Sequence, residues 1–152
     1  MIRLCQQDPR WGDMQLKPSN LTMKRYGCTT TAVCMLADKF RKPITPKIAL
    51  EKGYFKYTDG GLILWESIKV PSLKFNKRVR RFDKLDLRKQ VADRKKGVIL
   101  AVNNDAHWVA VRGRIPFTDH YWVNDPWDGK VKTTMKFFNI SGAAVFDGEI
   151  NI

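Results

Sequence analysis

Apolar residues in the first third of the chain recur with the spacing of a helix. From Ala32 onward they fall at positions 32, 33, 35, 36, 37 and 40, which covers most of the circumference of a helix with 3.6 residues per turn. This pattern predicts a central, largely buried helix that begins at Cys28 and ends near Phe40. Thr29 and Thr30 offer hydroxyl groups for its N-terminal cap.

Three further helices are predicted, all shorter or less apolar than the central one. Each carries a capping residue or apolar residues at helical spacing, and the segments are residues 46–50 after Thr45, residues 62–68, and residues 84–95 after Asp83. Residues 1–25 and 54–61 contain Pro or Gly and no sustained period, so we expect loops there.

The pattern changes after Gly97 to the short apolar runs and alternation of strands. Five segments have this character, namely residues 98–102, 107–113, 120–125, 130–138 and 143–146. Helices followed by a series of short strands are typical of an α+β fold with an antiparallel sheet. We therefore expect one domain over residues 1–152, with N-terminal helices packed on a C-terminal sheet.

The chain carries 28 Lys and Arg against 15 Asp and Glu, which gives a net charge of +13. Such a surface attracts polyanions, and nucleic acid, an anionic membrane and a bacterial cell wall all qualify. The charge is dense over residues 74–82, which predicts a strand with a solvated face, whereas we expect Trp65 in the core. No apolar run resembles a signal peptide or approaches the ~18 residues of a membrane span, so we expect synthesis in the cytoplasm.

The cysteines exclude some classes of protein. Cys5, Cys28 and Cys34 are odd in number and lack a paired framework, which argues against a disulfide-built scaffold. With only His107 and His120 beside them, no spacing matches a structural zinc site, and we expect no metal or other cofactor. Cys34 lies within the apolar helix and is expected to be inert, as is Cys5, and we assign no role to His120.

Cys28 has the position of an activated nucleophile. A cysteine in the first helical turn lies beside unpaired N–H groups and the positive end of the helix dipole, which favour the thiolate. Gly27 before it allows tight passage of the backbone and leaves room for a substrate carbonyl. The alternative is that Cys28 is a small buried hydrophobic residue, as many single cysteines are.

A hairpin formed by the second and third predicted strands would bring a histidine and an aspartate together. If its centre lies near position 116, His107 and Asp125 are directly opposite, within about 4.5–5.5 Å between Cβ atoms. The carboxylate would then fix the imidazole tautomer and leave the other ring nitrogen to accept a thiol proton. Alternatively, His107 is an ordinary strand-end residue and Asp125 a turn former before Pro126.

Five motifs follow one another along the chain between Gln6 and Pro126. They are Gln-x-Asp-Pro-x-Trp from Gln6, Tyr-Gly-Cys-x-x-Thr-Ala around Cys28, Thr-Pro at Thr45, His-Trp-Val-x-Val from His107 and Val-x-Asp-Pro around Asp125. This ordered set resembles the C39-like cysteine peptidases of the papain-like clan. The chain departs from that family after the cysteine, where Gly-Cys-Thr-Thr replaces the common Gly-Cys-Gly-Pro.

The resemblance implies a papain-like fold and a role for each matched residue. Cys28 would be the nucleophile, His107 the general base and acid, and Asp125 the group that orients the histidine. Gln6 matches the family's oxyanion-hole glutamine, which acts together with the Cys28 N–H; its neighbour Gln7 fits the motif spacing less well. From the residues alone, the loop over residues 6–12 is either a packing arm or part of a site.

Small basic domains of this kind resemble phage endolysins, which cut peptidoglycan after a holin opens a route across the membrane. We therefore expect a hydrolase that acts on an anionic cell-wall polymer or peptide. One alternative is a protease for a particular protein or leader peptide. The other is a nucleic-acid-binding protein without catalysis, suggested by the basic residues 77–81 and nearby aromatic residues. We expect Trp108, next to His107, to serve in packing.

Overall fold

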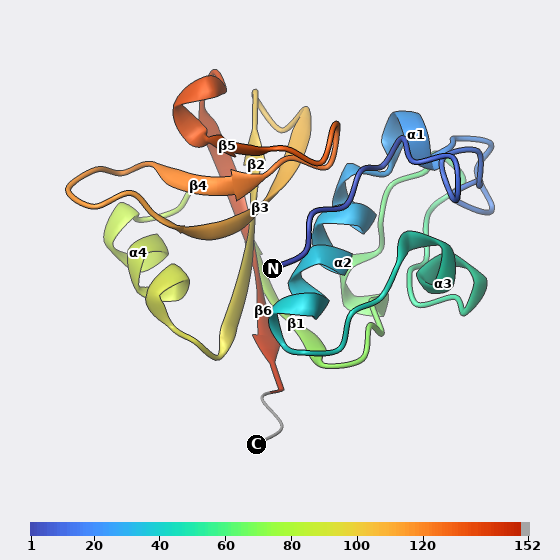
Figure 1. The fold of residues 1–152 in the computed structure, drawn as a ribbon, viewed down its shortest axis with the longest axis horizontal. Helices are drawn as coiled ribbons and strands as arrows, with labels where there is room; N and C mark the ends of the chain where they lie inside the picture. Colours follow the sequence, from blue (N-terminus) through green and yellow to red (C-terminus); the bar gives the residue numbers. More distant parts are fainter. Residues whose placement is uncertain (150–152) are drawn as a thin grey trace.

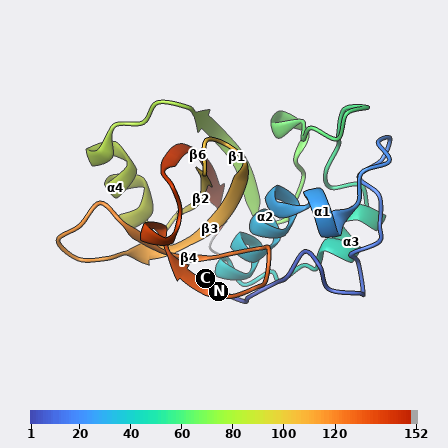
Figure 2. The same cartoon turned by 90° about the horizontal axis from the view of Figure 1, so that it is seen from above.

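The computed structural model describes residues 1–149, and its main feature is one six-stranded antiparallel sheet. Figure 1 shows the sheet between two groups of helices, with α1 (Met23–Tyr26), α2 (Cys28–Lys39) and α3 (Pro46–Glu51) on one side and α4 (Lys84–Ala92) on the other. Viewed from above, α2 lies closest to the sheet within the first group, and α3 lies farther out (Figure 2). The α+β class with an antiparallel sheet is confirmed, but the order of helices first and sheet last holds only in part, because strand β1 (Leu73–Val79) precedes α4.

The strand order across the sheet is β1-β6-β2-β3-β4-β5, so β6 inserts between β1 and β2. The strands are β1 (Leu73–Val79), β2 (Lys96–Val102), β3 (His107–Arg114), β4 (Tyr121–Asn124), β5 (Val131–Thr133) and β6 (Ile140–Gly148). The helices are α1 (Met23–Tyr26), α2 (Cys28–Lys39), α3 (Pro46–Glu51) and α4 (Lys84–Ala92), with 3-10 turns at Trp65–Ser67 and Thr134–Lys136.

Two apolar cores cover the two faces of the sheet. On one face, α2 packs on side chains that include Ile99 and Ala101 of β2. On the other face, Leu87 of α4 packs on side chains that include Val98 and Leu100. Successive residues of a strand point to opposite faces, so β2 contributes to both cores, which explains why its sequence is an unbroken apolar run.

The caps of two helices agree with the sequence. The Thr45 hydroxyl accepts a hydrogen bond from the Ile48 N–H at 3.2 Å, and the Asp83 carboxylate accepts one from the Leu85 N–H at 2.7 Å. The predicted cap of α2 was wrong. Gly27 is the N-cap residue, and no side chain caps the helix, because Thr29 and Thr30 already lie within its first turn.

Several predicted boundaries require correction. Residues 62–68 form only the 3-10 turn at Trp65–Ser67, and α4 ends at Ala92 rather than near residue 95. Residues 130–138 divide into β5 and a second 3-10 turn. The short helix α1 falls within a segment predicted as loop. These segments are short, and their side-chain spacing alone does not distinguish a single helical turn from a loop.

The predicted register of the β3–β4 hairpin was also wrong, by two residues. Val111 lies opposite Val123, and a bulge separates this pair from the Gly113 and Trp122 pair. The predicted centre near residue 116 would have placed His107 directly opposite Asp125. Because side chains alternate with a period of two, an error of two residues leaves each side chain on its predicted face.

Backbone hydrogen bonds join the N-terminal segment to the loop after β4 and to α1. The Gln6 N–H donates to the Pro126 carbonyl at 2.7 Å, which joins this segment to the loop after β4. The indole N–H of Trp11 donates to the Cys5 carbonyl at 2.8 Å, and its ring is buried. This segment is therefore an ordered arm that connects the loop after β4 with α1.

Candidate active site

Three of the predicted site residues lie at the ends of secondary-structure elements. Cys28 is the first residue of α2, His107 is the first residue of β3, and Asp125 directly follows β4. Helix α2 packs against β3, so the start of the helix is held against this part of the sheet. The fold thus gathers residues that are far apart in the sequence.

His107 and Asp125 are in direct contact. The imidazole Nε2 lies 2.5 Å from Asp125 Oδ1. The side chain of His107 is 17% exposed and that of Asp125 only 3%. With Nε2 bound to the carboxylate, Nδ1 is the ring nitrogen left for the thiol of Cys28.

The Asp125 carboxylate is bound on both of its oxygens. Oδ1 also accepts a hydrogen bond from the Trp127 N–H at 2.9 Å, while Oδ2 lies 2.6 Å from Lys132 Nζ. Lys132 in turn lies 3.0 Å from Asp128 Oδ2. The sequence analysis did not single out Lys132. Its spacing of four from Asp128 is a common ion-pair spacing and was the available signal.

These contacts shift the pKa values of the pair in opposite directions. Burial works against the charged carboxylate of Asp125, but hydrogen bonds from His107 and Lys132 outweigh burial and lower its pKa to about 2. Burial also works against the imidazolium of His107, yet its contacts with Asp125 and Cys28 raise its pKa to about 9. At neutral pH, Asp125 is therefore a carboxylate and His107 carries a proton.

The pKa of the Cys28 thiol is shifted in the direction opposite to that of His107. Burial would raise the pKa of its thiol, but hydrogen bonding to His107 and the charge of that ring prevail and lower the pKa below its ordinary value. The positive end of the α2 dipole acts in the same direction. A thiol with a lowered pKa beside an imidazole with a raised pKa favours a thiolate–imidazolium pair.

The backbone N–H of Cys28 is available to a ligand. Within residues 1–149, no backbone hydrogen bond uses this N–H, and the first one of α2 joins the Thr31 N–H to the Gly27 carbonyl at 3.0 Å. Free N–H groups in the first turn are a general feature of helices. Here one of them belongs to the residue that carries the thiol.

Gln6 is 1% exposed and lies against the end of α1. Its amide Nε2 donates to the Lys24 carbonyl at 3.2 Å and more weakly to the Met23 carbonyl at 3.5 Å. Its Oε1 is buried and has no partner within residues 1–149. Leaving a buried polar atom unpaired costs about 1–3 kcal/mol, which is the kind of cost that functional positions retain.

A tight turn connects β2 to His107. Asn103, Asn104 and Asp105 all adopt positive φ angles, of 54°, 56° and 66°. Side chains from the chain before and within β6 hold this turn, since the Asn104 N–H donates to Asn139 Oδ1 and the Asp105 N–H to Ser141 Oγ, at 2.9 and 2.8 Å. Asn and Asp tolerate this backbone region better than other side chains do. The turn thus fixes where β3, and with it His107, begins.

The other residues considered in the sequence lie around this centre. Cys34 is buried in α2, and burial raises the pKa of its thiol. Cys5 Sγ and Gln7 Nε2 both contact the Trp127 carbonyl, at 3.3 and 2.7 Å. His120 Nδ1 lies 3.0 Å from Thr134 Oγ1.

Three aromatic residues, Trp65, Trp108 and Phe137, lie around the candidate site. Trp65 was expected in the core and packs against its edge, but it is only half-buried and also lines a surface cavity. Trp108 packs against it, with ring centroids 5.0 Å apart, as a packing role requires. Phe137, which the sequence analysis did not single out, has its ring 6.2 Å from that of His107.

The described residues 1–149 contain no group of three His, Cys, Asp or Glu side chains arranged to hold a metal ion. Over the same residues, no helix has the length and apolar character needed to cross a membrane. Comparison with protein-family models, curated proteins and solved structures finds no match to this chain.

Proposed function

We propose that this protein is a cysteine peptidase that hydrolyses amide bonds, with Cys28 as nucleophile. The observation that carries the proposal is the direct contact of His107 with Asp125, with Cys28 at the start of the helix that packs against the strand of His107. The lowered pKa of Cys28 and the raised pKa of His107 agree with this arrangement. A nucleophile next to a base, with the base oriented by a third group, is the general requirement for this chemistry. A helix that carries the nucleophile and packs on an antiparallel sheet also supports a papain-like fold.

The first half of the reaction forms an acyl-enzyme. The Cys28 thiolate attacks the carbonyl carbon, and the carbonyl π electrons move to oxygen. The Cys28 N–H donates to the developing charge, and so does the Gln6 amide once it releases its weak bond to the Met23 carbonyl. Each such donor is worth about 2.7–4 kcal/mol in comparable sites. As the intermediate collapses, the C–N bond breaks, and His107 transfers its proton to the leaving amine.

The second half regenerates the enzyme. The neutral His107 removes a proton from water, whose oxygen attacks the thioester carbon. Collapse of this second intermediate breaks the C–S bond, which releases a carboxylic acid product and restores the thiolate. Asp125 stabilises the imidazolium each time it forms, and Lys132 holds Asp125 in place.

For the substrate, we propose peptide or amide bonds of bacterial peptidoglycan. Support comes from the net charge of +13, since stem-peptide carboxylates and teichoic acids are anionic. Attraction of this kind concentrates the enzyme on the wall and weakens as salt screens it. Such an enzyme would act at the cell wall, as an endolysin does, after a holin gives it access.

The direct test is digestion of purified peptidoglycan by the wild type, Cys28→Ala and Cys5→Ser, at low and moderate salt. We expect release of amines and loss of turbidity with the wild type and Cys5→Ser, and none with Cys28→Ala. Cys5 is a matched control because it is also a free, half-buried thiol. Equal activity of Cys28→Ala would exclude the thiol mechanism.

Inactivity of all three proteins on the wall would overturn the proposed substrate but not yet the chemistry. Labelling by a thiol-directed peptidyl inhibitor at Cys28 would then favour a protease for a particular protein. Binding to DNA or RNA with a steep salt dependence, unchanged in Cys28→Ala, would favour the nucleic-acid alternative.

A further inference from the structure

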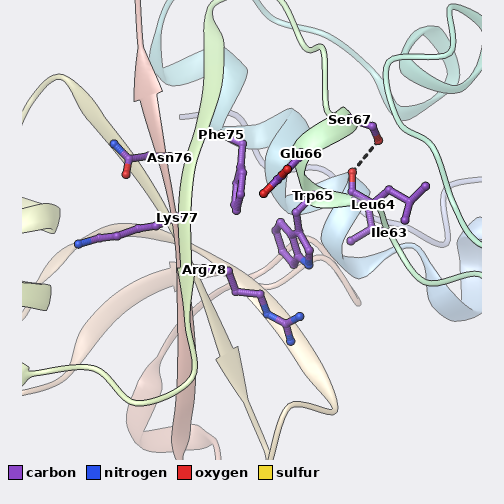
Figure 3. Close-up of a pocket in the computed structure, with 9 residues that line it drawn as sticks. All are labelled: Ile63, Leu64, Trp65, Glu66, Ser67, Phe75, Asn76, Lys77 and Arg78. Atoms are coloured by element: carbon purple, nitrogen blue, oxygen red, sulfur yellow. Dashed lines mark hydrogen bonds between the residues drawn. The ribbon is translucent and has the colours of Figure 1, made fainter.

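A groove runs along the face of the molecule that carries Trp65. Its inner part is a cavity of about 460 Å³. Thr29, which follows Cys28, and Trp108, which follows His107, both line this cavity. The outer part is an open depression of about 870 Å³ (Figure 3). The two parts share the residues Ile63, Trp65 and Arg78.

Arg78 lines both parts of the groove and lies at their junction. Its guanidinium carbon lies 5.4 Å from the ring centroid of Trp65 and 5.4 Å from that of Trp108. The two indole rings thus support the guanidinium, an arrangement that stabilises a cation and limits its rotamers. Within residues 1–149 Arg78 forms no ion pair, although it is exposed.

A bulge in β1 turns Arg78 toward the groove. Phe75 pairs with Phe146, and the next paired residue, Lys77, faces Val145, so Asn76 is an extra residue. In a regular strand, residues 75 and 78 would point to opposite faces. Figure 3 shows Phe75 and Arg78 on the side of Trp65, whereas Asn76 and Lys77 point away from it. Bulges are often found where a strand must redirect a side chain near a site.

Within residues 1–149, Arg78 is the cation of the groove that is left without a carboxylate partner. Lys77 pairs with Asp86 of α4, with 3.6 Å between Nζ and Oδ2. Asp105 lines the inner cavity, but its Oδ1 already accepts a hydrogen bond from Ser141 Oγ at 2.8 Å. Glu66 is exposed in the outer part and forms no ion pair with Arg78.

We propose that Arg78, supported by Trp65 and Trp108, binds a free carboxylate of the peptide substrate. This rests on the proposed function and names the class of substrate, which is a peptide with a carboxylate close to the bond that is cut. A guanidinium binds a carboxylate through two parallel N–H···O bonds, which fixes the orientation of the peptide as well as its charge. Arg78 is thus a specificity-determining residue and takes no part in proton transfer.

The test measures binding rather than turnover, so Cys28→Ala serves as the parent protein. The probes are soluble peptide fragments of purified peptidoglycan, and the same fragments after their carboxylates are converted to methylamides. Fluorescence of the tryptophans that line the groove reports binding. Three proteins are compared: Cys28→Ala alone, the double variant that also carries Arg78→Gln, and the double variant that also carries Arg80→Gln. Arg80 is also exposed on this segment but does not line the groove, so it matches the charge change.

We expect the parent to bind native fragments about tenfold or more tightly than amidated ones, as befits a hydrogen bond between charged groups. Arg78→Gln should bind both at the weaker affinity, while Arg80→Gln keeps the preference. Arg78→Lys retains the charge without the two-pronged geometry and should recover part of the preference, which also tests the proposal if Arg78→Gln fails to fold.

The proposal is overturned if Arg78→Gln keeps the preference, or if the parent binds neither probe. Tighter binding of a single-stranded oligonucleotide than of the fragments, lost in Arg78→Gln, would also overturn it in favour of a phosphate ligand. These outcomes concern binding alone. A failure of the proposed chemistry is detected separately, by the digestion of peptidoglycan with the wild type.

Discussion

Lys132 and His107 bind opposite oxygens of the Asp125 carboxylate, and Lys132 Nζ lies 2.6 Å from Oδ2. Rotation of the carboxylate would therefore break both contacts at once. Asp125 is almost fully buried, whereas the side chain of Lys132 is 26% exposed. Lys132 is thus a positioning residue in the proposed mechanism, because it restrains the carboxylate that orients His107, the proposed general base.

Replacement of Lys132 by Met should destabilise the protein. A buried carboxylate that loses one partner costs about 1–3 kcal/mol of the free energy of unfolding at pH 7. The pKa of Asp125 is held at about 2, so the stability that its ionised form provides is present at neutral pH and is lost as the pH falls toward 2. The difference from the wild type should therefore shrink in acid. Urea unfolding between pH 2 and 7 measures it.

Lys130→Met is the matched control for this prediction. Lys130 directly precedes β5, the strand that carries Lys132, and is exposed, and no ion pair within residues 1–149 involves it. It should leave the free energy of unfolding nearly unchanged, and Lys132→Arg should restore most of what Lys132→Met loses. A constant difference between Lys132→Met and the wild type down to pH 2 would show that the contact with Asp125 is not the cause.

Asp125→Asn should move the alkaline limit of activity to lower pH. Contacts with Asp125 help to raise the pKa of His107 to about 9, so the wild type loses its proton donor only as the pH rises through that value. Without the carboxylate, the pKa of His107 should fall toward its ordinary value near 6.5. The measurement is kcat/KM against pH. An alkaline limb that stays near pH 9 in Asp125→Asn would contradict this explanation.

The pair of His107 and Asp125 shows how much of the candidate site could be predicted from the sequence. Its hairpin could be predicted because His107 and Asp125 flank apolar strands of the right length. Its register could not, because the bulge between Val111 and Gly113 leaves no mark in the sequence. The predicted pair nevertheless came together, since an error of an even number of residues preserves the face of the sheet.

The orientation of Arg78 and the partial exposure of Trp65 in the groove could not be predicted from the sequence. Residues 74–82 look like a strand with a solvated face, and only the bulge at Asn76 turns Arg78 away from that regular alternation. Trp65 was predicted as a core residue because residues 62–68 have helical spacing, but only one 3-10 turn forms there. Both errors concern local backbone geometry, which tertiary packing decides.

Gln6→Ala should lower kcat by about 10²–10³ with little change in KM, as removal of one oxyanion donor does in comparable enzymes. Gln7→Ala is the control, because Gln7 is an exposed neighbour whose amide, within residues 1–149, binds only the Trp127 carbonyl, at 2.7 Å. It should stay within about threefold of the wild type. Steady-state kinetics on a released amine distinguish the two. Full activity of a less stable Gln6→Ala would assign Gln6 a purely structural role.

Gly27→Ala tests whether close packing before Cys28 sets the geometry of the site. The Gly27 backbone has a φ of −88°, which any residue adopts, so backbone strain is not the issue. A Cβ atom there would lie 2.6 Å from the Met23 carbonyl oxygen and 2.6 Å from the end of the Met23 side chain. The side chain can move, but the carbonyl can retreat only if α1 shifts, and the Gln6 amide is bound to that same helix.

We therefore expect Gly27→Ala to lose about 1–3 kcal/mol of stability, as overpacked sites do. We also expect kcat to fall more than in Gln6→Ala, because displacement of α1 disturbs both proposed oxyanion donors. Gly113→Ala is the control, since a Cβ at that position in β3 meets nothing within 4 Å. Unfolding curves and kinetics on both variants make the comparison. If Gly27→Ala is less stable but keeps its full kcat, then α1 can move without disturbing Gln6, and the link between this packing and the catalytic geometry is refuted.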